Sequence, residues 1–89
     1  MPGKFASIDP AELTLRRLKP RLEQRFAGQA AAHPAEWKAF IHRLALHFPR
    51  LFSLLHRLYG TQYDFYYHLE ELLASLAASW LDQIGRAHV

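Results

Sequence analysis

Two helix starts of nearly the same composition divide this chain. Asp9-Pro10-Ala11-Glu12 and His33-Pro34-Ala35-Glu36 each place a proline at the expected first helical position and a glutamate two residues later. Proline suits that position because the first amide of a helix has no acceptor within the helix. Apolar residues then recur after each start at spacings of three and four. The sequence therefore predicts helices that begin at Pro10 and at Pro34.

The apolar spacing predicts four helices in all, and no segment alternates as a strand would. The first covers 10–26 and is expected to kink at Pro20, or to break there and give five helices. Residues 27–32 are expected to form a loop. The second helix covers 34–48, and Pro49 is expected to end it and to begin a third that closes at Tyr59-Gly60. Thr61 or Asp64 is expected to cap the fourth.

The fold class expected from these elements is all-α, a bundle-like domain of four helices. Its core is expected to come from the apolar stripes of the second, third and fourth helices. The candidate core residues are Trp37, Phe40, Leu44, Leu55, Leu58, Leu69, Leu73 and Leu76.

Length and composition exclude several classes of protein. The 89 residues are too few for a (β/α)₈ barrel, which needs about 250. The chain has no cysteine, so it can hold neither a disulfide nor a thiolate metal site. Residues 1–9 lack the apolar run of a secretory signal, and no stretch approaches the roughly 18 apolar residues of a membrane span. We expect a cytoplasmic protein without a membrane partner.

The histidines do not have the spacing of a metal site. His42, His47, His56 and His68 include no pair four residues apart on one helix. A zinc site needs three or four converging ligands, so these side chains are expected to be ordinary surface or partly buried residues. We expect no metal and no other cofactor.

The chain also offers no pair of residues for catalysis. Glu70 and Glu71 are the only adjacent carboxylates. Neighbours on a helix point about 100° apart, so they cannot flank a scissile bond as two glycosidase carboxylates do. They are expected to form a solvated acidic face, although a pairing of Arg43 with Glu70 across two helices is also considered. No catalytic residue is expected.

A basic segment raises the possibility of nucleic-acid binding. The net charge is +3, and five basic residues fall within ten positions. They are Arg16, Arg17, Lys19, Arg21 and Arg25. A DNA-binding helix would present base-reading polar side chains beside its arginines, whereas these alternate with core leucines. A solvated or domain-contacting face is favoured, and no nucleic-acid partner is expected.

Tyr63 to Tyr67 forms an aromatic cluster at the start of the fourth helix. Aromatic rings can stack on sugars or bases, but packing against a neighbouring helix or domain is the favoured interpretation.

The last six residues, Ile84 to Val89, depart from the apolar pattern of the fourth helix. They match the in-frame translation of a common DNA-sequencing adapter. We therefore expect the native domain to cover 1–83 and 84–89 to be an artefact. A frayed terminus is the alternative.

The centre of the chain resembles the N-terminal helical domain of amylosucrases. That family shows W-x-x-F-x-x-R-x-x-x-H-F-P-x-L-x-x-x-L-x-x-x-Y-G, followed on its next helix by L-E-x-L-L-A. The resemblance extends over about residues 15–80. The matching motif residues here are Trp37, Phe40, Arg43, His47, Phe48, Pro49, Tyr59, Gly60, Leu69 and Glu70.

The resemblance implies a parent enzyme of the α-amylase superfamily. Such a glycosyltransferase cleaves sucrose, transfers the glucosyl unit to an α-1,4-glucan and releases fructose by a retaining mechanism. Its catalytic Asp and Glu lie on a barrel that has no counterpart here, so no catalytic residue is carried over. The expected partner of this domain is that missing catalytic barrel. The alternatives are a stand-alone helical interaction module and a small basic nucleic-acid-binding protein.

Overall fold

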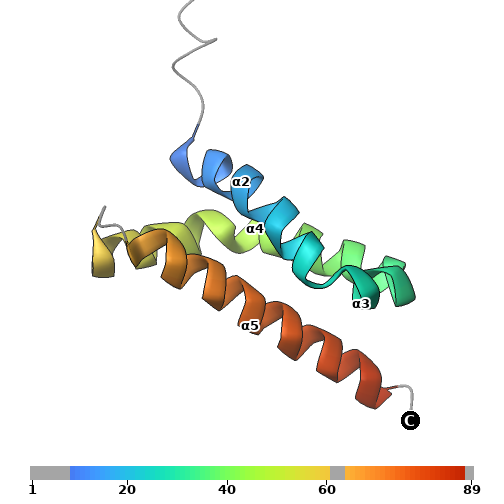
Figure 1. The fold of residues 1–89 in the computed structure, drawn as a ribbon. Coiled ribbons are helices and arrows are strands. Elements are labelled where there is room, and N and C mark those ends of the chain that lie inside the picture. Colours follow the sequence, from blue (N-terminus) through green and yellow to red (C-terminus); the bar gives the residue numbers. More distant parts are fainter. Residues whose placement is uncertain (1–8, 61–63, 88–89) are drawn as a thin grey trace, which may run out of the picture.

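The chain folds into four helices in the computed structural model, which describes residues 9–60 and 64–87. They are α2 (Pro10–Arg25), α3 (Ala27–Ala32), α4 (Pro34–Tyr59) and α5 (Asp64–Ala87). No strand occurs among the described residues, which confirms the all-α class. In Figure 1, α4 and α5 form an antiparallel hairpin, α2 packs across it, and α3 joins α2 to α4.

The start of α2 follows the sequence prediction. The Asp9 carboxylate accepts a hydrogen bond of 3.1 Å from the Ala11 amide, and Pro10 occupies the first helical position. Pro20 lies inside the helix and is exposed, and α2 continues through it without a break. The five-helix alternative is therefore wrong.

The prediction of a loop over 27–32 is wrong, because these residues form the short helix α3. The Phe26 amide closes α2 by donating to the Leu22 carbonyl at 3.1 Å, and the Phe26 carbonyl then accepts from Ala30 at 2.8 Å. Four of the six residues in Ala27–Ala32 are alanine, the residue with the highest helix propensity. That propensity outweighs the single glycine, Gly28.

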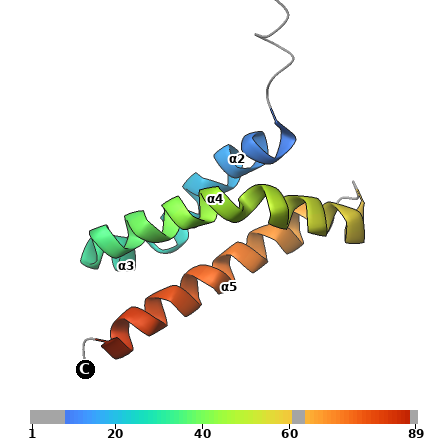
Figure 2. The same ribbon diagram turned by 180° about the vertical axis from the view of Figure 1, so that it is seen from behind.

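The prediction that Pro49 separates two helices is also wrong. Residues 34–59 form one helix of 26 residues with Pro49 in its interior. The helix bends part-way along its length (Figures 1 and 2), as expected where a proline removes one backbone hydrogen bond. Phe48 before the proline and Phe52 after it both pack into the core, so burial holds the two halves in phase. Gly60, with φ 67°, ends the helix.

The described part of α5 begins at Asp64, which lies in the first turn of the helix. The other candidate cap, Thr61, lies outside the described residues. The helix continues past Gln83 to Ala87. Arg86 pairs with Asp82 at 3.1 Å within this last part. The segment expected to be foreign to the domain is thus helical as far as it is described, and its adapter origin stays a prediction.

The core lies where α2, α4 and α5 meet. Five of the eight predicted core residues are buried: Trp37, Phe40, Leu44, Leu69 and Leu73. A sixth, Leu55, is partly buried against them.

The prediction is wrong for Leu58 and Leu76, which are 67% and 42% exposed. Residues two apart on a helix point nearly opposite ways. Since Ala74 lines a hollow shared with α2, Leu76 lies on the side of α5 away from α2. There Leu76 lines an open groove between α4 and α5, together with Phe40 and Leu44.

Candidate interaction surface

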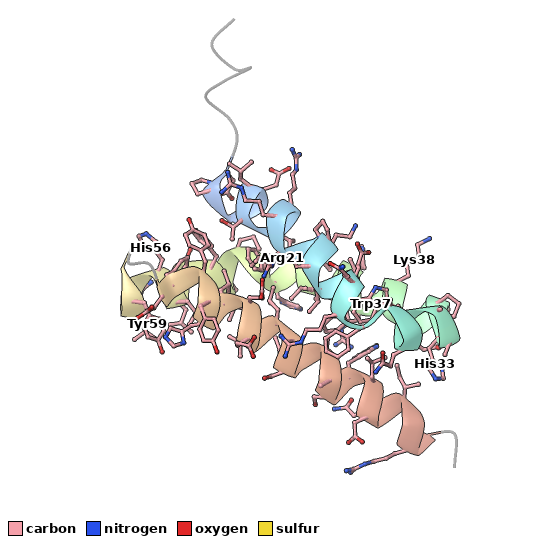
Figure 3. All side chains as sticks on the ribbon, viewed as in Figure 1. Arg21, His33, Trp37, Lys38, His56 and Tyr59 are labelled. Carbon is pink, nitrogen blue, oxygen red and sulfur yellow. The ribbon has the colours of Figure 1, made fainter. Side chains whose placement is uncertain are left out.

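A chain of aromatic rings links three segments at the α3 end of the molecule. Ring centroids lie 5.9 Å apart for Phe26 and Trp37, 5.5 Å for Trp37 and Phe40, and 6.1 Å for Phe40 and Trp80. Trp37, labelled in Figure 3, is only 7% exposed. The motif residues Trp37 and Phe40 therefore hold the α2–α3 junction, α4 and α5 together.

Trp80 fixes the position of α5 against α4 through two further contacts. Its indole N–H donates to the Glu36 carbonyl oxygen at 3.1 Å. The Arg43 guanidinium lies 5.5 Å from the Trp80 ring centroid, within the range of a cation–π interaction. The predicted pairing of Arg43 with Glu70 is therefore wrong, because Arg43 contacts a ring from α5.

A second aromatic group closes the hairpin at its other end. Phe65 is 1% exposed, and its ring meets Phe52 edge-on at 5.4 Å and His56 at 5.7 Å. Packing against a neighbouring helix, the favoured interpretation of the 63–67 cluster, is confirmed for Phe65. Tyr66 and Tyr67 are exposed, and Tyr63 lies outside the described residues.

Tyr59 and His68 stack at 4.7 Å near the same end, so the motif residue Tyr59 also joins α4 to α5. His56 and Tyr59 are labelled in Figure 3.

The carboxylates Glu70 and Glu71 face α2 and are paired, which corrects the expected solvated acidic face. The Arg21 guanidinium donates two hydrogen bonds to the Glu70 carboxylate, and the Arg25 guanidinium donates to Glu71 at 2.9 Å. The Glu70 side chain is only 23% exposed. Hydrogen bonding to Glu70 raises the pKa of Arg21, and hydrogen bonding to Glu71 raises the pKa of Arg25. Part of the basic segment therefore holds α2 against α5.

A double-mutant cycle distinguishes the observed pairing from the predicted one. Arg21→Ala and Glu70→Ala are expected to be coupled, because each removes the partner of the other. Arg43→Ala and Glu70→Ala are expected to be additive. Urea denaturation followed by circular dichroism measures both cycles. Coupling in the Arg43 cycle alone would contradict the observed geometry.

The other residues of the amylosucrase-like motif lie in the core or beside a groove. Phe48 and Leu69 are among the most deeply buried side chains. His47 is exposed, at the edge of a groove of about 360 Å³ between α4 and α5. Phe40, Trp80 and Leu76 also line this groove.

The polar side chains of the described residues form no metal-ligand cluster and no buried unpaired group. Across 9–60 and 64–87 no three histidine, aspartate or glutamate side chains gather as metal ligands would. Within the same ranges no buried polar side-chain atom lacks a hydrogen-bond partner. Among the helices described, none combines the length and the apolar character needed to cross a membrane.

One surface, the exposed face of α4, was not predicted from the sequence. Leu54 and Leu58 are 53% and 67% exposed, and Arg50 and Arg57 lie beside them. We call these four residues the α4 seam. Arg50, Leu54 and Arg57 also line a shallow hollow of about 510 Å³. The seven-residue spacing of the arginines was the available signal, but it was hidden by the assumption that Pro49 divides the segment.

Comparisons with known proteins leave the family undecided. No family model matches the chain, and no curated protein or solved structure is similar enough to count as a match.

Proposed function

We propose that this chain is a non-catalytic helical docking domain of an amylosucrase-like enzyme. The observation that carries the proposal is the exposed α4 seam. Large apolar side chains that lie together on a protein surface mark a site of interaction with another protein, a membrane or a ligand. Leu54 and Leu58 are such side chains, and a hollow adjoins them.

The amylosucrase pattern supports the identity of the parent. Its residues here perform packing and helix-ending roles: Trp37, Phe48 and Leu69 are buried, and Gly60 ends α4. A pattern whose members build the core is what a structural domain would carry. Catalysis in the parent then belongs to a separate barrel, which would bind sucrose and the α-glucan in the cytoplasm.

Extending the source gene beyond the codon for Gln83 tests this proposal. We expect an open frame that enters a (β/α)₈ barrel carrying the Asp and Glu of the α-amylase superfamily. A stop codon after Val89 in the native gene would contradict it. Turnover of sucrose by the purified 89-residue chain would also overturn it, since the proposal assigns no catalytic role to this chain.

A stand-alone interaction module is the second candidate. It is favoured by the single core that α2, α4 and α5 share, because such a unit has its own packing. The gene test separates the two candidates. Nucleic-acid binding has less support, because Arg21 and Arg25 are paired with carboxylates of α5.

A further inference from the structure

The arginines of α4 recur in a fixed register. Arg43, Arg50 and Arg57 are seven residues apart. Seven residues are nearly two turns of an α-helix, so the three side chains lie on one side of α4 at intervals of about 10.5 Å. Because Pro49 lies inside one continuous helix, this register extends across the whole row.

The leucines beside this arginine row occupy the two core positions of a heptad repeat. Leu51, Leu54 and Leu58 follow one another at spacings of three and four, as the two core positions of a coiled coil do. In this register each arginine occupies the flanking position just before a core position. Such flanking positions determine partner choice through charge.

Among the residues that the structure describes, packing covers only one flank of this leucine row. Phe48 and Leu55 occupy the other flanking position and pack into the core. Leu54 and Leu58 stay more than half exposed. The leucine row is thus covered on the side of Phe48 and Leu55 and open on the side of Arg50 and Arg57. Arg43, of the same arginine row, instead contacts Trp80 of α5.

The charge of the open flank indicates its partner. The segment 37–59 contains no aspartate or glutamate, and the only acidic residue of α4 is Glu36 in its first turn. A partner helix that lies along the seam would contact a row of arginines, and α4 has no acidic side chain beside them that would offset their charge. Two copies of this chain joined antiparallel through the seam would bring their arginine rows together, which disfavours self-association.

From this register and charge we infer that the α4 seam binds an acidic amphipathic helix of a partner protein. The leucines of that helix would pack on Leu54 and Leu58, and its carboxylates would pair with Arg50 and Arg57. The inference rests on the proposed docking function and specifies its surface. The partner that it names is a second protein and not the catalytic barrel of the same chain. None of these four positions belongs to the amylosucrase pattern.

The test uses two designed helical peptides of about three heptads. Both carry leucine at the two core positions, and one has glutamate at its flanking positions where the other has lysine. Fluorescence anisotropy of the labelled peptides measures binding to the full 89-residue chain. We expect the glutamate peptide to bind and the lysine peptide to bind at least about tenfold more weakly.

The decisive variant is Arg50→Glu with Arg57→Glu. We expect it to lose about tenfold to a hundredfold in affinity for the glutamate peptide, because two attractive arginine–glutamate pairs become repulsive glutamate–glutamate pairs. We expect it to gain affinity for the lysine peptide, because repulsion between arginine and lysine becomes attraction between glutamate and lysine. Arg43 is left unchanged because it contacts Trp80. Circular dichroism checks that the variant keeps its helices.

The matched control is Arg17→Glu with Lys38→Glu, which changes the net charge equally at exposed positions outside the seam. We expect the control to keep the peptide preference of the original chain. Equal loss in both variants, or no change of preference in the seam variant, would overturn the inference.

A membrane partner gives a different result. Vesicles of phosphatidylcholine and phosphatidylserine that bind the chain through Arg50 and Arg57, while the glutamate peptide does not bind, would overturn the inference. These outcomes are independent of the gene test. A stop codon after Val89 combined with specific peptide binding would remove the amylosucrase parent and keep the docking surface.

Discussion

Trp37→Ala is expected to lower the free energy of unfolding by about 3–5 kcal/mol, the usual cost of truncating a buried tryptophan. The indole is 7% exposed and contacts the rings of Phe26 and Phe40. Its removal would leave a cavity where the α2–α3 junction meets α4. Urea denaturation followed by far-ultraviolet circular dichroism measures the change.

The expected loss is large relative to the whole stability, which for a domain of this length is about 4–13 kcal/mol. Trp37→Phe therefore serves as the milder variant, since it keeps an aromatic ring in the site. We expect it to cost less than the alanine variant and to leave a cooperative unfolding transition. A loss below about 1 kcal/mol for Trp37→Ala would place the indole outside the core.

Phe65→Ala is expected to cost a similar amount, about 3–5 kcal/mol. Phe65 is 1% exposed and anchors the first turn of α5 against Phe52 and His56 of α4. Removing the ring would loosen the end of the hairpin where the chain turns from α4 into α5. The same denaturation experiment measures the effect.

Tyr66→Ala is the matched control for this second prediction. Tyr66 is the next residue along α5 and is 49% exposed. We expect its truncation to cost less than about 1 kcal/mol, because most surface substitutions have small effects. If the two variants lost equal stability, the assignment of Phe65 to the core would be wrong.

The sequence predicted well wherever a local signal was sufficient. The helix starts at Pro10 and Pro34 and the helix end at Gly60 depend on backbone geometry within a few residues, and all three are found. The period of the apolar residues predicted which side of each helix packs inward, and five of the eight expected core residues are buried.

The sequence failed where burial competes with local preference. Pro49 was expected to end a helix, yet the core contacts of Phe48 and Phe52 keep the helix continuous across it. The same error concealed the register of Arg43, Arg50 and Arg57, because an interrupted helix has no common phase. The candidate interaction surface was therefore not predicted.

The sequence by itself determined the all-α class, three helix boundaries and the inward stripe of each long helix, because capping residues and apolar periodicity act over short distances along the chain. Only the tertiary structure decided that Glu70 pairs with Arg21 while Arg43 lies over Trp80. It also decided that Leu58 stays exposed although it continues the apolar stripe. A stripe shows that a residue can be buried, but burial requires a second helix to lie against it, and the placement of that helix depends on the packing of the whole chain.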